Sequence, residues 1–370
     1  MAVIGVVGLG VMGLGIAQVY AQAGHRVLAT DAHAPAREAA LERLAAAMAP
    51  RVAAGRMTEA AMQAVLARVE LCDLAGFGAA NLVIEAIAER LDAKRALFAA
   101  LEQVTGAVLA TNTSALSVAR VAEGLARPER VLGLHFFNPA PAMKLVELVA
   151  GPETSAAALA LARGLTEGTG KVVVACADTP GFIVNRCARP FYGEALALLE
   201  EGRTAGEVDA AMLAAGYRLG PFALIDLVGA DINLAATEGL AAAMGGHPRY
   251  HVFDALRAQV AGGDLGRKTG RGFVYPDAVG AAPTDAAAIA LRIEAVLVNE
   301  AAYLLGEGGV DAVGIDTAMV LGLNFPRGPF AAGRVLGFGA VRAELERLAE
   351  RAPGHLVGRY DVAPLLAVMD

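Results

Sequence analysis

The chain has 370 residues, which is enough for two or three domains that each bury a core, so a single small module is excluded. Its net charge of -7 argues against binding a nucleic-acid backbone but leaves room for a local basic pocket that holds an anionic small molecule. Apolar residues make up 56% of the chain, yet no uninterrupted apolar run reaches membrane-spanning length. We therefore expect a soluble protein with neither a nucleic-acid nor a membrane partner.

Location and metal content can be judged from the first residues and the cysteines. An apolar strand begins almost at Met1, which leaves no room for a secretory signal and favours a cytoplasmic protein. Cys72, Cys176 and Cys187 show neither Cys-x-x-Cys spacing nor a histidine cluster nearby. We predict no metal site and no disulfide framework.

The first residues have the pattern strand, glycine turn, helix. Residues 2–7 form a short apolar run, and residues 14–23 form an amphipathic stretch. Between them, Gly8 permits a tight turn, Gly10 lets the backbone approach a pyrophosphate, and Gly13 allows close packing of helix on strand. This arrangement places phosphates at a helix N-terminus and predicts a dinucleotide site. A glycine-rich turn without a ligand is the alternative.

The second predicted strand supports the dinucleotide interpretation. Residues 26–30 end at Asp31, which stands at the right distance to accept hydrogen bonds from an adenosine ribose. An acid at this position favours NAD over NADP as cofactor. Further strands alternate with helical stretches, which predicts an α/β fold with a Rossmann-type doubly wound, mostly parallel sheet. These strands are expected at residues 69–71, 82–85, 108–110, 131–135, 144–149 and 171–174.

A long helical excursion separates the second and third strands. Residues 35–68 exceed the length of a plain crossover and are interrupted near Pro50 and Gly55, which predicts a helical hairpin that projects from the sheet. Arg51 and Arg56 fall near its tip. Solvated arginines are the favoured interpretation over a phosphate contact.

A histidine and a glutamate occur in two neighbouring predicted strands. His135 ends one strand, and Glu147 lies in the next, after a proline-rich turn. Side by side, these strands would bring the two side chains together as a general base and its orienting acid. A core histidine beside an unrelated glutamate is the alternative.

Ser114 closes a polar cluster at the carboxyl edge of the sheet, where ligands of such folds bind. It can either cap the helix that starts near Ser117 or reach a substrate oxygen.

The second half is predicted to be helical and internally repeated. Residues 178–186 leave the sheet and begin a long helix that runs through Glu200. Asn185 near the helix start has Leu291 as its counterpart in the second copy, so we expect only the first copy to contact the reacting groups. A basic loop at residues 266–273 is interpreted as a lid or a linker that leads to a strand-like end. The recurring residues are Glu194 and Glu300, Asp209 and Asp316, and the Gly-Pro-Phe steps at 220–222 and 328–330.

These patterns predict three domains. Residues 1–180 form an NAD-binding Rossmann domain with the hairpin insertion, and residues 181–283 and 284–370 form two helical domains.

Several motifs in order resemble the L-3-hydroxyacyl-CoA dehydrogenases. They are the glycine fingerprint, Val83-Ile84-Glu85-Ala86, Asn112-Thr113-Ser114, His135-Phe-Phe-Asn-Pro, Asp178-Thr-Pro-Gly-Phe-Ile-Val-Asn-Arg and Gly-Arg-Lys268-Thr-Gly. The resemblance covers about residues 3 to 275, and the second module resembles the duplicated C-terminal domain of longer members. It implies two all-α domains of the 6-phosphogluconate dehydrogenase C-terminal type.

The resemblance implies NAD-dependent, reversible oxidation of (S)-3-hydroxyacyl-CoA to 3-oxoacyl-CoA in acyl-CoA degradation. His135 is then the catalytic base and Glu147 its partner, while Ser114 and Asn185 hold the substrate oxygen. The hairpin helps to hold CoA. The residues implied to bind NAD are Gly8, Gly10, Met12, Gly13, Asp31, Glu89, Lys94, Asn138 and Lys268.

Two relatives of the same fold keep other functions open. Sugar-acid dehydrogenases of the gulonate type are one, and non-catalytic NAD-binding lens crystallins are the other. Phe136, Phe137 and the Met143 to Glu147 segment fit the acyl-CoA enzymes better. The duplication predicts either a monomer with an internal pseudo-dimer or a homodimer.

Overall fold

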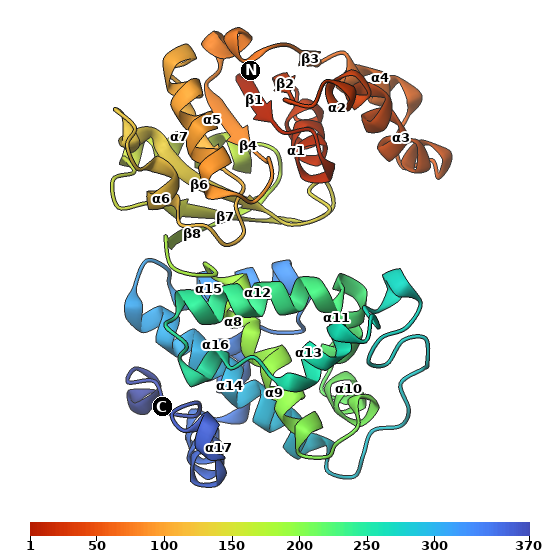
Figure 1. Ribbon diagram of the computed structural model, residues 1–370, viewed down its shortest axis with the longest axis vertical. Helices are drawn as coiled ribbons and strands as arrows, with labels where there is room; N and C mark the ends of the chain where they lie inside the picture. The colour runs from red at the N-terminus through yellow and green to blue at the C-terminus, as the bar shows by residue number, and fades with distance from the viewer. The chain divides into compact units, whose positions relative to one another are not determined.

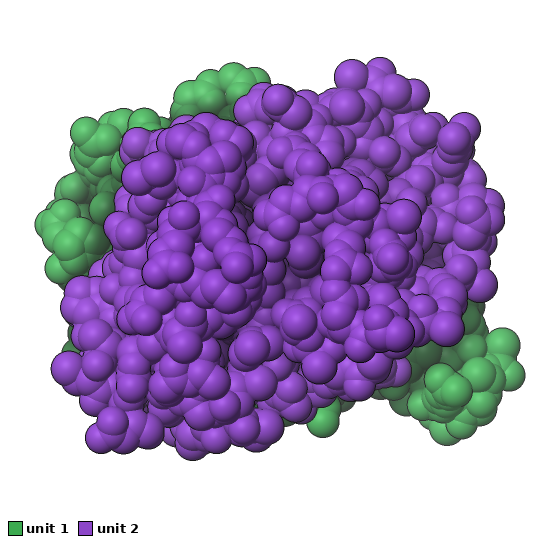
Figure 2. Space-filling model, turned by 90° about the horizontal axis from the view of Figure 1, so that it is seen from below, with its two compact units in different colours: residues 1–179 green, residues 180–370 purple.

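The computed structural model describes residues 1–370 as two compact units, Met1–Thr179 and Pro180–Asp370 (Figure 2). No helix in it is both long and apolar enough to cross a membrane.

The first unit is built on one eight-stranded sheet in the order β3-β2-β1-β4-β5-β6-β7-β8. Neighbouring strands are parallel except β6 and β7, which are antiparallel. The predicted doubly wound, mostly parallel sheet is therefore confirmed. The strands are β1 (Val3–Val7), β2 (Arg26–Thr30), β3 (Val69–Leu71), β4 (Leu82–Glu85), β5 (Val108–Thr111), β6 (Val131–Phe136), β7 (Leu145–Ala150) and β8 (Val172–Ala177).

Helices of the first unit pack on this sheet through apolar side chains, among them Ile16 and Tyr20. The first helix starts three residues earlier than predicted, at Val11, and runs through Gly13, whose missing side chain allows close contact with the Gly8 carbonyl after β1. The helices are α1 (Val11–Gln22), α2 (Ala34–Glu38), α3 (Ala40–Ala53), α4 (Glu59–Leu66), α5 (Leu91–Val104), α6 (Val118–Ala122) and α7 (Ala156–Glu167).

The predicted helical hairpin is formed by α3 and α4, which lie at one edge of this unit (Figure 1). Thr58 caps α4 by accepting a hydrogen bond from the Ala61 amide. The predicted interruption at Pro50 is wrong, because α3 continues through this residue to Ala53. Pro50 lies in the last turn of α3, where its ring removes a single helical hydrogen bond.

The second unit contains helices and no strand of the sheet. The predicted helix through Glu200 is present as two consecutive helices separated at Ala188. The predicted strand-like end of the basic loop is wrong, since residues 273–275 form bends and a turn. The helices are α8 (Val184–Cys187), α9 (Arg189–Glu200), α10 (Ala205–Ala214), α11 (Pro221–Val228), α12 (Ala230–Ala243), α13 (Asp254–Ala261), α14 (Ala286–Glu307), α15 (Ala312–Leu323), α16 (Pro329–Leu336) and α17 (Phe338–Arg351).

The predicted repeat recurs as the same local structure twice. Asp209 accepts hydrogen bonds from the first free amides of α11, and Asp316 does the same for α16. A Cβ on Gly220 would lie 2.3 Å from the Asp209 carboxyl carbon, and one on Gly328 would lie 2.4 Å from that of Asp316. Glycine therefore precedes both helices because the capping carboxylate occupies the space of a side chain.

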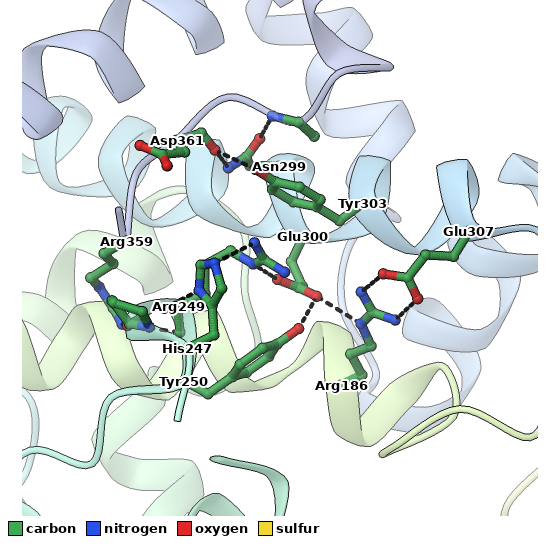
Figure 3. A network of polar contacts seen from close by, with 12 residues as sticks. Arg186, His247, Arg249, Tyr250, Asn299, Glu300, Tyr303, Glu307, Arg359 and Asp361 are labelled. Atoms are coloured by element: carbon green, nitrogen blue, oxygen red, sulfur yellow. Dashed lines mark hydrogen bonds and ion pairs between the residues drawn. The ribbon is translucent and has the colours of Figure 1, made fainter. Parts of the chain in front are cut away.

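The two copies exchange buried ion pairs in a reciprocal way. Arg186 of the first copy donates through Nε to Glu300 at 2.7 Å and through both Nη atoms to Glu307 (Figure 3). Arg292 of the second copy donates in the same pattern to Glu194, also at 2.7 Å, and to Glu201. Such reciprocity is the signature of two similar surfaces related by a twofold axis.

A tyrosine and a second arginine complete each half of this network. Tyr250 and Arg249 hydrogen-bond to Glu300, as Figure 3 shows, and Tyr360 and Arg359 hydrogen-bond to the other buried carboxylate, Glu194. Burial alone raises the pKa of Glu194, but Arg359 and Arg292 outweigh that effect and lower it below the usual value.

Candidate functional site

His135 and Glu147 are direct cross-strand neighbours on β6 and β7. His135 Nδ1 lies 2.6 Å from a carboxylate oxygen of Glu147, and both side chains are buried. The prediction that the two strands lie side by side and bring these residues together is confirmed. Because the carboxylate accepts a hydrogen bond from Nδ1–H, Nε2 of the neutral ring is left as the basic atom.

Ser114 is held at the carboxyl edge of the sheet by Glu89. One carboxylate oxygen of Glu89 accepts hydrogen bonds from the Ser114 amide at 3.0 Å and from the Thr113 hydroxyl at 2.5 Å. The cap of α6 is Ser117, whose hydroxyl accepts from the Arg120 amide. The alternative role of Ser114 as a helix cap is therefore wrong, and its hydroxyl lies 3.5 Å from the same Glu89 oxygen.

A buried ion pair fixes Glu89 in place. Lys94 is 1% exposed, and its ammonium lies 2.6 Å from Glu85 and 3.1 Å from Glu89. Thr111 donates to the other oxygen of Glu85. Lys94 and Glu85, which are nine positions apart along the chain, thus support the turn that carries Ser114.

The glycine turn forms a cradle that fits a pyrophosphate. Gly8 has a φ of 95°, which favours glycine, and its amide donates to Thr30. A Cβ on Gly13 would lie 1.7 Å from the Gly8 carbonyl oxygen, whereas a Cβ on Gly10 would meet nothing within 4 Å. Gly10 therefore borders open space at the N-terminus of α1, where backbone amides favour an anion.

Asp31 lies beside this turn, at the end of β2. Its two carboxylate oxygens accept hydrogen bonds from the Leu9 amide at 2.7 Å and from the His33 amide at 2.8 Å. It borders a cavity of about 760 Å³, which also contacts Gly8 and Gly10. The size and lining of this cavity fit the adenosine half of a dinucleotide.

A second cavity, of about 650 Å³, lies between α1, the hairpin and the turn after β6. Arg43, Arg51 and Arg56 line it together with Asn138. The prediction that Arg51 and Arg56 lie near the hairpin tip is confirmed, and here both border a cavity. Arg43, which the sequence did not single out, also donates to the Leu9 carbonyl of the glycine turn.

Met12, another residue implied to bind NAD, is partly buried and packs against the core of the sheet.

In the second unit, Asn185 stands in α8, and Lys268 stands in the short turn Arg267–Thr269. Lys268 pairs with Asp231. A residue that sequence reasoning missed, Asp226, accepts hydrogen bonds from three successive amides at residues 273–275. A Cβ on Gly272 would lie 2.0 Å from an oxygen of this carboxylate, so the basic loop is anchored to α11.

Comparison with known proteins decides the family. A model of the 3-hydroxyacyl-CoA dehydrogenase NAD-binding domain matches residues 3–179, and a model of the C-terminal domain of the same enzymes matches residues 181–275 and 289–369. The chain belongs to the 3-hydroxyacyl-CoA dehydrogenase family. The family expected from the motifs is thereby confirmed, together with NAD as cofactor and the class of NAD-dependent oxidoreductases.

Similar proteins carry names of this family. The chain is 45% identical over 274 residues to 3-hydroxyadipyl-CoA dehydrogenase of Escherichia coli strain K12, which covers 73% of this chain and 58% of that protein. It is 39% identical over 273 residues to a probable 3-hydroxybutyryl-CoA dehydrogenase of Bacillus subtilis, covering 72% and 95%.

Solved structures extend the likeness to the whole chain. The crystal structure of 3-hydroxybutyryl-CoA dehydrogenase from Escherichia coli K12 superposes with a TM-score of 0.90 at 34% identity and covers 99% of this chain and 97% of that one. The Rossmann unit followed by two helical copies is therefore the fold of a known enzyme of the family.

Proposed function

We propose that this dehydrogenase oxidises the C3 hydroxyl of an acyl-CoA with His135 as the general base. The cross-strand contact between His135 and Glu147 carries the proposal, because it leaves Nε2 to take the hydroxyl proton while the buried carboxylate stabilises the imidazolium. NAD, when bound, supplies the acceptor for the hydride that leaves C3. In the reverse direction, the imidazolium returns the proton to the oxygen.

Ser114 and Asn185 are proposed to donate hydrogen bonds to the substrate oxygen as negative charge develops on it. The hold of Glu89 on the Ser114 amide supports this role, since a fixed donor needs little reorganisation during the reaction. The direct test is the oxidation of NADH by the purified protein when acetoacetyl-CoA is supplied.

The NAD site is proposed to use the glycine turn for the pyrophosphate and Asp31 for the ribose. The remaining proposed contacts come from the resemblance, with Lys94 acting through Glu89 because its ammonium is buried. The proposed NAD residues are Gly8, Gly10, Met12, Gly13, Asp31, Glu89, Lys94, Asn138 and Lys268.

We expect NADH to be a far better hydride donor than NADPH, because Asp31 would repel a 2′-phosphate. Replacing Asp31 by Ala should narrow the preference by weakening NADH binding while leaving kcat at saturating cofactor largely unchanged. Steady-state kinetics with both cofactors measure the effect. Equal kcat/KM values for NADH and NADPH in the unaltered protein would contradict the assignment of Asp31.

The cavity beside the hairpin is proposed to receive the nucleotide end of CoA. Arg43, Arg51 and Arg56 gather three positive charges around one cavity in a chain of net charge -7, which supports binding of an anionic group. Guanidinium groups pair well with phosphate oxygens. The acyl-CoA substrate and this mode of holding it are both parts of the proposal.

Replacing Arg51 or Arg56 by Ala should raise KM for acetoacetyl-CoA by about 2-fold to 10-fold each, since exposed ion pairs contribute little individually. The value of kcat should not change, because the lost contact is the same in ground and transition states. A truncated thioester of N-acetylcysteamine, which lacks the nucleotide, should show no change of KM. Arg127→Ala, another exposed arginine, is the control. An equal rise of KM for both thioesters would mean that Arg51 and Arg56 do not contact the nucleotide of CoA.

The domain boundaries at residues 180 and 283 are proposed as well, together with a chain whose two helical copies act as an internal pseudo-dimer. The reciprocal pairs of Arg186 with Glu300 and of Arg292 with Glu194 support this, because each copy supplies what a partner subunit would otherwise supply. A monomeric mass in solution is the expected readout.

A cytoplasmic location is also proposed, and three free cysteines fit a reducing compartment.

A gulonate-type sugar-acid dehydrogenase remains the second candidate from the sequence. Turnover of gulonate without activity on acetoacetyl-CoA would favour it.

A further inference from the structure

Arg189 is a buried cation without a carboxylate partner. It is 8% exposed and stands at the start of α9. Its hydrogen bonds go to three neutral acceptors: the carbonyl oxygens of Asn185 and Asn233 and the hydroxyl of Thr237. Its guanidinium carbon lies 4.8 Å from the ring centroid of Tyr192. A buried charge held only by neutral groups is costly and is rare unless it has a function.

The other buried arginines of the helical unit are neutralised. Arg186, Arg292 and Arg359 each contact a buried glutamate. Burial lowers the pKa of Arg189 and no carboxylate compensates, whereas for Arg186 the effect of burial is outweighed by Glu307 and Glu300, which raise its pKa. Arg186, Arg292 and Arg359 thus each have a negatively charged partner, whereas Arg189 has none.

We call Arg189, Asn233 and Thr237 the polar cage. Two polar groups in this cage are available for a ligand. The Nη2 atom of Arg189 makes no hydrogen bond within the chain, although a guanidinium offers five N–H donors. The buried side-chain oxygen of Asn233 also lacks a hydrogen-bond partner. Rotation of that amide would present its NH2 group as a second donor for an incoming oxygen.

The second copy shows that the fold does not need this polar cage. Arg292 of the second copy corresponds to Arg186 of the first, so the residue that corresponds to Arg189 is Ala295. The spacing that relates the helix-start glycines Gly229 and Gly337 places Val341 and Leu345 where the first copy has Asn233 and Thr237. All three counterparts are buried and apolar. The second copy has the ion-pair network but has no counterpart of Asn185, Arg189, Asn233 or Thr237.

The position of Arg189 matches the far end of a short substrate. Asn185 and Arg189 are four residues apart on the consecutive helices α8 and α9, which places them on one face about 6 Å apart along the axis. Three carbon–carbon bonds of about 1.5 Å separate C3 of a six-carbon acyl chain from C6, a span of about 4 Å. A group on C6 would therefore lie near Arg189 if Asn185 contacts the oxygen on C3.

We propose that Arg189 binds the terminal carboxylate of the acyl chain, so that the preferred substrates are CoA thioesters of 3-hydroxydicarboxylic acids of about six carbons. This assignment rests on the proposed function, in which Asn185 contacts the C3 oxygen. A carboxylate would neutralise the guanidinium of Arg189 and accept a hydrogen bond from its Nη2. The name of the similar 3-hydroxyadipyl-CoA dehydrogenase describes such a substrate for that relative.

The test compares two six-carbon thioesters, 3-hydroxyadipyl-CoA and 3-hydroxyhexanoyl-CoA, which differ only in the terminal carboxylate. The unaltered protein should favour the dicarboxylate about 10-fold to 100-fold in kcat/KM, as expected for a hydrogen bond between charged groups. Arg189→Met should remove this preference by raising KM for 3-hydroxyadipyl-CoA more than KM for 3-hydroxyhexanoyl-CoA. Arg189→Lys should keep part of the preference, and Arg351→Met, on the exposed end of α17, should keep all of it.

The outcomes separate this inference from the proposed function. Oxidation of both thioesters with equal kcat/KM by the unaltered protein, or an equal loss on both in Arg189→Met, would overturn the inference and leave the dehydrogenase function in place. Failure to oxidise either thioester would overturn the proposed function itself.

A variant that carries the residues of the second copy at these positions controls for loss of folding. The triple change Arg189→Ala, Asn233→Val and Thr237→Leu replaces the cage by the apolar set of the second copy, and buried charges replaced by packed apolar groups often leave stability unchanged or increased. This variant should keep or raise Tm, oxidise 3-hydroxyhexanoyl-CoA and lose the preference for the dicarboxylate. A triple variant that folds and still favours 3-hydroxyadipyl-CoA as the unaltered protein does would contradict the assignment.

Discussion

Replacing His135 by Gln is expected to lower kcat by about 100-fold to 10,000-fold, the usual contribution of general acid–base catalysis. The glutamine amide has no basic nitrogen to take the C3 hydroxyl proton or to return it in the reverse reaction. The affinity for NADH should remain nearly unchanged, because the glycine turn and Asp31 belong to other strands of the sheet. Stopped-flow and steady-state assays with acetoacetyl-CoA, together with NADH titration by fluorescence, measure both quantities.

The same argument predicts a lower kcat for Glu147→Gln. An amide in place of the carboxylate can present the wrong partner to the Nδ1 proton of His135 and cannot stabilise the imidazolium 2.6 Å away. A Glu147→Gln variant with unaltered kcat at every pH would mean that the contact is structural, and His135 would then lose its proposed role. Thermal melting of both variants is the control for folding.

Removing residues 284–370 is expected to abolish the soluble monomer. Glu194 is fully buried and takes all its charged partners, Arg292 and Arg359, from the deleted part. An ionised carboxylate left buried without a partner strongly destabilises the folded state. The truncated chain should therefore aggregate or form a dimer in which each subunit provides the missing face. Light scattering and sedimentation measure the outcome.

A point variant gives the same test in the full chain. Arg292→Met should lower the free energy of unfolding by about 3 kcal/mol, because it leaves Glu194 with one of its two arginines. Arg257→Met, which breaks an exposed pair with Glu238, should change it by less than about 1 kcal/mol. A truncated chain ending at Pro283 that stays monomeric, soluble and active would show that the first copy needs no partner.

The sequence predicts features that depend on neighbours along the chain. The strand, glycine turn and helix at the N-terminus follow from apolar periodicity and from the tolerance of glycine for positive φ, so the cofactor turn could be placed to within a few residues. The contact of His135 with Glu147 was also predictable, because a short turn between two strands fixes an antiparallel pair whose register aligns them.

Features that depend on distant residues could not be predicted. Nothing local distinguishes Arg186, which pairs with a carboxylate more than a hundred positions away, from Arg189, which has no carboxylate at all. Asp226 looks like any helical acid until the loop at 273–275 folds onto it. Side-chain partners of this kind are set by how helices pack, which hydrophobic periodicity alone does not determine.

Asn185 and Arg186 are consecutive residues of α8. Asn185 is the proposed donor to the substrate oxygen, and Arg186 binds an anchor that lies outside the first copy. The anchor is Glu300 and Glu307 of α14. A donor serves a developing charge best when its direction is fixed before the substrate arrives. Under the proposed function, the second copy, which has Leu291 at the corresponding position, contributes to the reaction by fixing the direction of Asn185 in the first copy. Sequence changes in α14 can on this basis alter turnover without touching either ligand.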